Sequence, residues 1–528
     1  MGKFYITTPI YYVNAKPHIG HAYTQIVVDV LARFHKMLGE EVFFLTGTDE
    51  HGEKIEEASL AAGFEKGREK EFVDTIVPSF KKVWEELEIE YDDFIRTTDP
   101  EHEREVQRFL ESMWEKGDIY QGEYDGLYCT PCETYWTQTQ ASGGDCPECG
   151  RPVKELKEKN YFFRMGRYQQ WLKEYIENEP EFILPDFRRN EVLGFLKEGL
   201  NDLCISRPKE RMSWGIELPF DKEYVVYVWF EALINYISGL KKNGHMNMWP
   251  ADYHVIAKDI IRHHAVFWPI MLKSMDMPLP GTIFAHGWWK MGADKMSKSR
   301  GNIVDPLELK DKYGVDPIRY FLIKAVVLGN DGSFSEEAFV TLYNSDLAND
   351  LGNLLNRTLT MVDKYFKGIS PEADPSKADN AQAQRSRSLL ESALNLVPGI
   401  KEDYLDEPGI LLTEALSRIM LVIGKANKYI EESAPWEFAK KGDTGSIGLI
   451  MADLLEVLRN AAVGLYPFIP YSAGQMWSQM GLGDLEEALE KGELVREFEK
   501  AGAGERRFPP GVRTEKGDPL FMRIKKEG

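Results

Sequence analysis

The chain has few cysteines and no long apolar run. Five cysteines in 528 residues are too few for a disulfide scaffold, which excludes the small secreted proteins that depend on such bonds. The longest uninterrupted apolar stretch, residues 265–272, falls far short of the ~18 residues that a membrane-spanning helix needs. The N-terminus lacks the basic segment, apolar run and small-residue cleavage site of a signal peptide. We therefore expect a soluble, cytoplasmic protein that does not associate with membranes.

Positive charge is also scarce. Lysine and arginine total 64 against 85 aspartates and glutamates, which gives a net charge of −21. This acidity argues against broad, non-specific binding to nucleic acids, although a local basic path remains compatible with it. Hydrophobic residues make up 43% and charged residues 28%, as in ordinary globular proteins, so disorder and fibrous repeats are excluded. The length favours three or four domains at ~150 residues each.

The first fifty residues have a β-α-β pattern. Residues 4–8 are β-prone and are followed by a predicted loop over residues 9–17. Apolar residues then recur at helical spacing from Ile26 to Leu38, and residues 41–46 form a second apolar strand. Polar residues follow this strand at positions 47–49. The pattern predicts an α/β fold with a parallel sheet whose site lies at the carboxyl ends of the strands.

The rest of the chain divides into an interrupted α/β domain and a helical end. Strand-like segments return at residues 223–229, 253–257 and 282–285, whereas residues 117–160 are irregular and rich in glycine and cysteine. We infer one α/β domain that is split by an insertion of roughly 110 residues. Beyond about residue 345 apolar residues recur in steps of four and three, which predicts a helix bundle.

A histidine motif, Pro17-His18-Ile19-Gly20-His21, lies where the first loop meets the first helix. The N-terminus of a helix favours phosphate, because its N–H groups are unpaired and carry partial positive charge. His18 and His21 can donate hydrogen bonds to phosphoryl oxygens, and Gly20 allows a base or ribose to approach the backbone. Taken alone, the pair is more often two half-buried histidines that cap a turn.

A basic loop, Lys295-Met296-Ser297-Lys298-Ser299, lies some 275 residues downstream. Lys295 and Lys298 could neutralise the charge that builds up on a departing pyrophosphate in the transition state. A solvated basic turn is an equally good explanation of the loop by itself. The histidine motif upstream makes the phosphate interpretation the stronger one.

Four cysteines form two C-x-x-C pairs separated by thirteen residues. Four thiolates at this spacing are typical of a closed, tetrahedral zinc site with a structural role, and four unliganded cysteines are a weaker explanation. The expected ligands of one structural Zn²⁺ are Cys129, Cys132, Cys146 and Cys149. Cys204 lies outside this cluster and is expected in the core.

The order of these motifs resembles the methionyl-tRNA synthetases, a family of class I aminoacyl-tRNA synthetases. HIGH at residues 18–21 and KMSKS at residues 295–299 flank the split α/β domain, as in this class. The resemblance runs from near residue 4 to at least Trp436. Four further segments match the family: TTPIYY at 7–12, GTDEHG at 47–52, YVW at 227–229 and KDI at 258–260.

The resemblance implies a methionine–tRNA ligase. Such an enzyme activates L-methionine with ATP to methionyl-adenylate and pyrophosphate, and then transfers methionine to the 3′-terminal adenosine of tRNA(Met), including the initiator. The implied catalytic and ATP-binding residues are His18, Gly20, His21, Lys295 and Lys298, with Mg²⁺ bound to the ATP. The methionine carboxylate is itself the nucleophile, so catalysis must come from alignment and from stabilising phosphoryl charge.

The family's methionine pocket can be carried over residue by residue. Asp49 would accept the substrate ammonium, and Arg207 matches an arginine near the carboxylate. Aromatic edges and a slender slot suit a polarizable thioether. Without the family, Trp229 and Tyr236 would be taken as ordinary core residues on one helix face. The implied methionine-binding residues are Ile10, Tyr12, Asp49, Arg207, Trp229, Leu233, Tyr236, Ile260 and His264, and at position 233 some relatives carry proline.

The resemblance also assigns the tRNA contacts and the domains. Asn353, Arg357 and Trp436 match the anticodon readers, since amide and guanidinium groups can bind base edges and an indole can stack on a base; each could equally be a helix-surface or bundle residue. Zinc would fold the insertion that guides the acceptor end. The implied domains are a Rossmann-like catalytic domain in two halves (1–116 and 223–286), the connective insertion with a zinc knuckle (117–222), a KMSKS and stem-contact region (287–344) and an anticodon-binding bundle (345–528).

Two other kinds of protein are weighed against this interpretation. A synthetase for leucine, isoleucine or valine carries a larger editing insertion, and the cysteine enzyme places zinc in its substrate site. A non-catalytic RNA-binding paralogue could keep the fold and the zinc, but binding alone would not require both the histidine and the lysine motifs. Because the chain ends without the dimerising module of some relatives, we expect a monomer.

Overall fold

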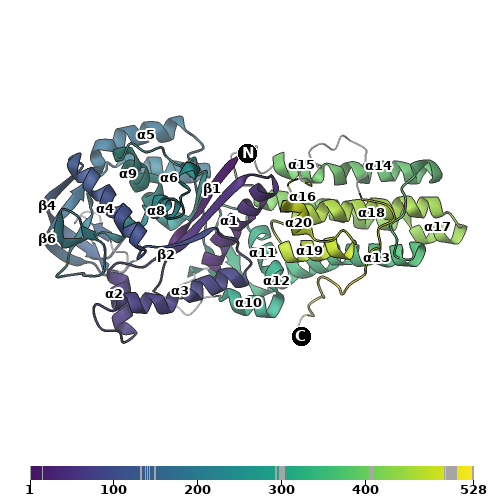
Figure 1. Ribbon diagram of the computed structural model, residues 1–528, viewed down its shortest axis with the longest axis horizontal. Helices are drawn as coiled ribbons and strands as arrows, with labels where there is room; N and C mark the ends of the chain where they lie inside the picture. The colour runs from purple at the N-terminus through teal and green to yellow at the C-terminus, as the bar shows by residue number, and fades with distance from the viewer. Residues whose placement is uncertain are drawn as a thin grey trace. The chain divides into compact units, whose positions relative to one another are not determined.

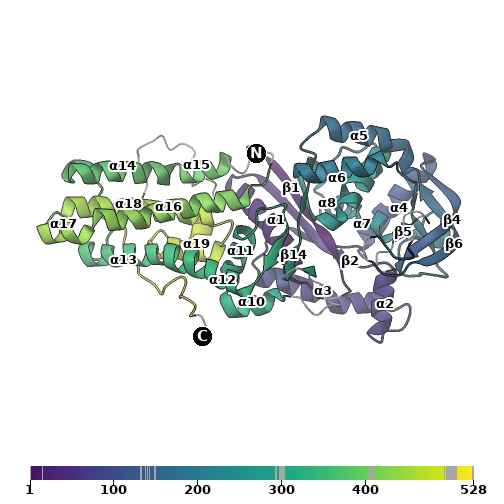
Figure 2. The same ribbon diagram turned by 180° about the vertical axis from the view of Figure 1, so that it is seen from behind.

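The computed structural model divides into two compact units (Figures 1 and 2). Residues 3–28 and 42–286 form the first, here called the sheet unit, and residues 1–2, 29–41 and 287–528 form the second, the helical unit. Among the described residues no helix is long and apolar enough to cross a membrane. Side chains at 134, 135, 291, 294 and 295 are not described. The described residues are 2–14, 16–130, 134–136, 138, 141, 143–147, 150–291, 294–295, 304–402, 409–490, 492, 494 and 508–525.

A six-stranded sheet organises the sheet unit. Its order is β3-β2-β1-β12-β13-β7, and the pairings of β2 with β3, β1 with β12, β12 with β13 and β13 with β7 are parallel. The central strands are almost entirely buried, as expected for a parallel sheet covered on both faces. The strands are β1 (Lys3–Tyr12), β2 (Glu41–Asp49), β3 (Asp93–Arg96), β7 (Ile183–Leu184), β12 (Tyr253–Ala257) and β13 (Thr282–His286).

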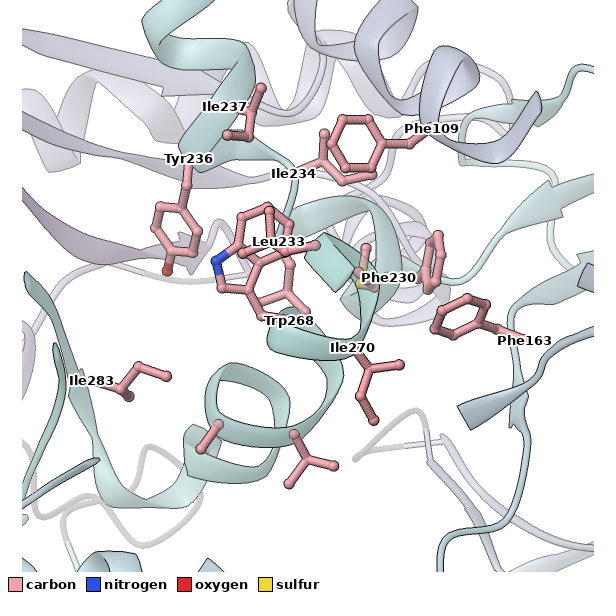
Figure 3. Packing of buried hydrophobic residues seen from close by; sticks show 14 of the residues in the cluster. Phe109, Phe163, Phe230, Leu233, Ile234, Tyr236, Ile237, Trp268, Ile270 and Ile283 are labelled. Atoms are coloured by element: carbon pink, nitrogen blue, oxygen red, sulfur yellow. The ribbon is translucent and has the colours of Figure 1, made fainter. Parts of the chain in front are cut away.

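Helices connect the strands of this sheet, because parallel neighbours require a long crossover connection between the end of one strand and the start of the next. Figure 3 shows the packed side chains of the core between them, with Tyr236 beside the indole of Trp268. The helices of this unit are α1 (Ile19–Met37, whose residues from Asp29 onward belong to the helical unit), α2 (Glu53–Ala61), α3 (Glu69–Glu86), α4 (Pro100–Glu115), α5 (Gln169–Asn178), α6 (Asp186–Lys197), α7 (Val228–Ala232), α8 (Asn235–Lys242) and α9 (Trp268–Ser274).

The cysteine-bearing segment contains a four-stranded antiparallel sheet in the order β5-β4-β6-β8. Its long hairpin pairs Ile119 with Phe163 and continues to Tyr128 with Lys154. Residues 117–160 are therefore not part of the six-stranded sheet, as expected, but the expectation of short, irregular segments is wrong for β4 and β6. Cys204 is buried, as expected. The strands here are β4 (Ile119–Cys129), β5 (Thr134–Trp136), β6 (Lys154–Phe163) and β8 (Leu203–Cys204), followed by a second small sheet of β9 (Ser206–Pro208), β10 (Glu217–Leu218) and β11 (Asp221–Val226).

The helical unit is a bundle preceded by a small three-stranded sheet. Helices α13, α14, α16 and α18 run side by side in both views (Figures 1 and 2), and α18 is buried along almost its whole length. The helices are α10 (Pro306–Tyr313), α11 (Val315–Lys324), α12 (Glu336–Leu342), α13 (Asn353–Phe366), α14 (Asn380–Leu394), α15 (Leu396–Lys401), α16 (Leu412–Ser433), α17 (Pro435–Lys441), α18 (Thr444–Leu465), α19 (Pro470–Gln479) and α20 (Leu485–Glu490), and the strands are β14 (Trp289–Met291), β15 (Asp294–Lys295) and β16 (Gly332–Phe334).

Two expected strand boundaries need correction. The first strand does not end at Thr8 but continues through Pro9 to Tyr12, so the predicted loop begins later. The expected strand over 223–229 ends at Val226, and Trp229 lies in the short helix α7. The strands expected at 253–257 and 282–285 are confirmed, the second with one additional residue.

Candidate active site

The two histidines of the HIGH motif stack on each other at the start of α1. Their ring centroids are 3.8 Å apart and the ring planes meet at 19°. The backbone N–H of His18 donates to Nδ1 of His21 at 3.2 Å, and the N–H of Gly20 donates to Nδ1 of His18 at 3.1 Å. Both Nδ1 atoms therefore act as acceptors, so the hydrogen of each neutral imidazole is on Nε2.

Gly20 has a steric reason to be glycine. A Cβ atom at this position would lie 2.9 Å from Cε1 of His18, closer than side chains tolerate. The position therefore preserves the stacked arrangement of the two imidazoles, in addition to leaving the backbone open.

Aromatic residues from three elements meet at the carboxyl end of β1. The rings of Tyr12 and Trp229 form an edge contact with centroids 5.8 Å apart. His263, in a π-helical turn over His263–Phe267, stacks on Trp229 with centroids 4.0 Å apart. Ile10 and Ile260, both partly buried, pack with Tyr12 and Trp229 against the buried core of the sheet unit. The structure thus gathers residues that are 250 positions apart in the chain.

Tyr236 and His264 form a buried hydrogen-bonded pair in the same region. Nδ1 of His264 lies 2.9 Å from the carbonyl oxygen of Ile260, so this nitrogen carries the hydrogen and donates it. The hydroxyl of Tyr236 is 2.7 Å from Nε2 of His264 and is therefore the donor in that contact. Burial lowers the pKa of His264 to about 4, which keeps the imidazole neutral at physiological pH. Leu233 is buried in the same core.

Asp49 ends β2 in a row of buried polar groups. It is 2% exposed, and its backbone oxygen accepts from the N–H of Val13, next to Tyr12. The following residue, Glu50, is fully buried and accepts two hydrogen bonds from the guanidinium of Arg96, at 2.6 and 2.8 Å. This bidentate ion pair fixes the end of the strand that carries Asp49.

Arg207 is buried between two tyrosines. Its guanidinium carbon lies 4.5 Å from the ring centroid of Tyr227 and 5.4 Å from that of Tyr128, which is on β4 of the inserted segment. One of its nitrogens donates to the backbone oxygen of Ser206 at 2.8 Å. Arg207 thus connects the inserted sheet to the segment that leads into Trp229.

The lysines of the KMSKS segment are described only in part. The backbone of Lys295 lies in β15, where it pairs with Lys290 of β14. Lys290 forms an ion pair with Asp331, with Nζ and Oδ2 2.6 Å apart. Lys298 lies outside the described residues, and so do Cys132 and Cys149 of the expected zinc site.

Cys129 and Cys146 come together in one small apolar cluster. Both are buried, and they share this cluster with Leu127, Trp136 and Ala141. The backbone around Cys146 turns sharply, because the N–H of Cys146 donates to Arg151 and the N–H of Gly150 donates back to Cys146. One cysteine of the first C-x-x-C pair and one of the second therefore lie in the same buried cluster.

The three expected anticodon residues lie on two helices of the bundle. Asn353 and Arg357 are one turn apart on α13, with Asn353 exposed. Arg357 forms an ion pair of 2.7 Å with Glu431 of α16. Trp436, five residues after Glu431, is 37% exposed at the start of α17. The ion pair brings Arg357 close to the chain segment that carries Trp436.

Sequence reasoning missed His263 and a buried acid, Glu231, that lies between two histidines, His51 and His102. One signal was available for Glu231, because a carboxylate within the apolar segment VWFEALI needs a buried partner. No periodicity identifies that partner. His263 has no signal of its own beyond its place beside His264.

Comparison with known proteins identifies the family of the chain. The family model of class I tRNA synthetases (M) matches residues 4–155 and 151–359. The methionine–tRNA ligase of Caldanaerobacter subterraneus subsp. tengcongensis is 47% identical over 99% of this chain and 79% of its own length. That of Thermotoga maritima is 43% identical over 99% of this chain and 80% of its own length.

Solved structures give the same result. The Mycobacterium tuberculosis methionyl-tRNA synthetase in complex with methionyl-adenylate superposes with a TM-score of 0.89 at 38% identity, covering 99% of this chain and all of that one. The free form of the same enzyme gives 0.82 at 36% identity, with 99% of each chain covered. The chain therefore belongs to the methionine–tRNA ligases, the methionine branch of the class I tRNA synthetases.

Proposed function

We propose that the chain performs the two steps of a methionine–tRNA ligase through the residues described above. In the first step a carboxylate oxygen of methionine attacks the α-phosphorus of ATP; the bond to the bridging oxygen breaks, and pyrophosphate leaves with Mg²⁺. In the second step a ribose hydroxyl of the 3′-terminal adenosine of tRNA(Met) attacks the carbonyl carbon of the adenylate; the bond between this carbon and the phosphate oxygen breaks, and AMP leaves with the hydroxyl proton. The observation that supports this most directly is the stacked histidine pair, in which each Nδ1 accepts a hydrogen bond from a backbone N–H.

His18, Gly20 and His21 bind the phosphates in this proposal. Two neutral imidazoles whose Nδ1 atoms are already occupied can each donate from Nε2 to a phosphoryl oxygen. They start the 19-residue helix α1, whose N-terminal dipole favours the same anionic group. Lys295 and Lys298 would supply positive charge to the pyrophosphate end of ATP. The attack itself needs no general base, because the methionine carboxylate is already ionised.

Methionine is held by polar groups at its ends and by aromatic groups along its side chain. Asp49 accepts the ammonium, Arg207 lies near the carboxylate, and Tyr12 and Trp229 offer ring edges to the thioether. Because His264 stays neutral, the sulfur meets no buried cation there. The remaining residues that we assign to this site are Ile10, Leu233, Tyr236 and Ile260.

Zinc has a structural role in this proposal, and Cys129, Cys132, Cys146 and Cys149 would hold it. The support is the burial of Cys129 and Cys146 in one cluster, because a closed thiolate site requires its pairs to converge. The metal would fold the insertion within residues 117–222, between the two catalytic halves at 1–116 and 223–286. The boundary at 286 coincides with that of the sheet unit.

The anticodon is read by the bundle at 345–528. Trp436 is exposed enough to stack on a base, and Asn353 and Arg357 offer donors on one face of α13. Residues 287–344 would form the KMSKS and stem-contact region that precedes this bundle in the chain. We infer that the enzyme works in the cytoplasm, where ribosomes use charged tRNA.

Methionine-dependent exchange of pyrophosphate into ATP tests this proposal. The purified chain should incorporate labelled pyrophosphate into ATP with L-methionine and Mg²⁺, and not with cysteine, leucine, isoleucine or valine. A preference for one of those amino acids would make it a different synthetase. Binding of tRNA without any exchange would favour the non-catalytic paralogue.

A further inference from the structure

A fully buried carboxylate, that of Glu231 in α7, lies between two histidines in the sheet unit. Its Oε1 is 2.9 Å from Nδ1 of His51, and its Oε2 is 3.5 Å from Nε2 of His102. All three side chains are at most 4% exposed. His51 precedes α2, and His102 belongs to α4. Three separate elements are thus joined through one carboxylate.

The network extends to a fourth element. Nδ1 of His102 is 2.8 Å from the hydroxyl of Ser238 in α8, and that hydroxyl also donates to the backbone oxygen of Asn235. On the other side, the ring of His51 packs against Trp214 with centroids 5.0 Å apart. The indole N–H of Trp214 donates to the backbone oxygen of Glu50 at 2.5 Å. Together these contacts leave the turn after β2 little freedom.

Charge makes the contact between Glu231 and His51 specific. Burial by itself would lower the pKa of His51, but the carboxylate of Glu231, helped by Glu103 and Glu50, raises it. Burial would likewise raise the pKa of Glu231, but the two imidazoles lower it. Both shifts of pKa favour the imidazolium form of His51 and the carboxylate form of Glu231. Buried pairs of this kind contribute little to stability compared with apolar residues of similar size, which directs attention to what they position.

Three residues of the network lie two positions after a residue of the methionine site. His51 follows Asp49, Glu231 follows Trp229, and Ser238 follows Tyr236. In a helix, residues two apart point in nearly opposite directions, since each residue turns the chain by about 100°. Trp229 and Tyr236 can therefore face the substrate while Glu231 and Ser238 face the network behind it.

Helix α7 has particular need of such support. It has five residues, fewer than two turns, and a helix this short has no stability of its own. The position of the Trp229 ring relative to the Asp49 carboxylate must therefore come from tertiary contacts. Among the described residues, the ion pair of Glu231 with His51 is a charged contact that joins α7 to the turn after Asp49.

We propose that Glu231 and His51 are positioning residues for methionine, which set the distance between the ammonium acceptor and the aromatic wall without touching the substrate. This inference rests on the proposed function of Asp49 and Trp229. Loss of the pair should weaken methionine binding much more than ATP binding, because the phosphate contacts lie on α1, which is not part of the network.

Steady-state pyrophosphate exchange of Glu231→Gln tests this directly. The variant should raise the KM for methionine at least tenfold at pH 7.5, with the KM for ATP within twofold of wild type. His51→Gln should have the same effect. The KM for methionine of the double variant should not exceed that of the more impaired single variant, because both substitutions remove the same interaction. Glu101→Gln, which removes an exposed acid of α4 that pairs with Arg104, is the matched control and should leave both constants within twofold.

The pH dependence adds a readout that a general loss of stability would not change. In wild type the KM for methionine should rise with pH for two reasons: His51 loses its proton above its raised pKa, and the amino group of methionine loses its own. Glu231→Gln should abolish the first contribution and keep the second. Active-site titration corrects each variant for its folded fraction. Three results would overturn the inference: equal changes in the KM values for methionine and ATP, a double variant whose effect is the product of the two single effects, or an effect of Glu101→Gln as large as that of Glu231→Gln. Absence of exchange in wild type would instead overturn the proposed function.

Discussion

His21 allows the proposed phosphate contacts to be tested atom by atom. Its Nδ1 accepts from the backbone N–H of His18 at 3.2 Å, so the structure assigns the phosphate contact to Nε2. The amide of asparagine reaches about as far as Nδ1, whereas the amide of glutamine reaches about as far as Nε2. His21→Asn can therefore keep the contact to His18 but has no donor at the Nε2 position, and His21→Gln has one.

The expected magnitudes follow from the kind of contact that is lost. A donor to charge that develops in the transition state is worth about 10²–10³ in rate, so His21→Asn should slow adenylate formation by that factor. His21→Gln should stay within about tenfold of wild type, which corresponds to about 1.4 kcal/mol. Single-turnover formation of methionyl-adenylate, measured by rapid quench at saturating methionine and ATP, gives both rates.

The order of the two variants is the critical result. If His21→Asn is faster than His21→Gln, Nδ1 makes the contact and the tautomer assignment is wrong. If both remain within threefold of wild type, the histidine pair does not contact the phosphates.

Three further predictions concern stability, pH and tRNA. Asp29→Asn removes the carboxylate that pairs with the buried guanidinium groups of Arg33 and Arg319, which should lower the free energy of unfolding by about 3–5 kcal/mol and lower the melting temperature of the helical unit. Glu432→Gln, in an exposed pair with Lys428, should change the free energy of unfolding by less than about 1 kcal/mol. Equal effects of the two substitutions would contradict the assignment. Burial holds the pKa of His264 at about 4, below its unfolded value near 6.5, so the neutral group contributes stability above pH 6.5 that is lost as the pH falls toward 4, by about 1.4 kcal/mol per pH unit. In His264→Gln the urea midpoint of unfolding should depend less on pH between pH 7 and 5 than in wild type. An unchanged dependence would refute this. Trp436→Ala should raise the KM for tRNA about 5- to 150-fold, the value of one stacked base, with pyrophosphate exchange unchanged; a parallel loss of exchange would mean a folding defect.

Much of the sheet could be predicted because its strands are short apolar runs bounded by polar residues. The strand at 253–257 was predicted with its correct bounds, and the strand at 41–46 continues through Asp49 as β2. Trp229 was misplaced in a strand because EYVVYVW is β-prone throughout. The chain leaves the strand after Val226, where Glu231 becomes buried against His51, and this tertiary contact outweighs local propensity.

The candidate site was predictable as a set of residue types but not as an arrangement. The family resemblance supplied Tyr12, Trp229, Tyr236 and His264, and the structure brings them together. The ring of His263 on Trp229 depends on a π-helical turn that no pattern in the sequence marks. The tautomers of His18 and His21 depend on backbone contacts and are equally invisible in a sequence.

The central claim is that activation of methionine is driven by stabilising phosphate charge and not by a general base. The most direct test is the single-turnover rate of adenylate formation in Lys298→Ala, with methionine binding measured separately by equilibrium dialysis. We expect a rate lowered by about 10² or more with the affinity for methionine unchanged. A rate within tenfold of wild type would contradict it.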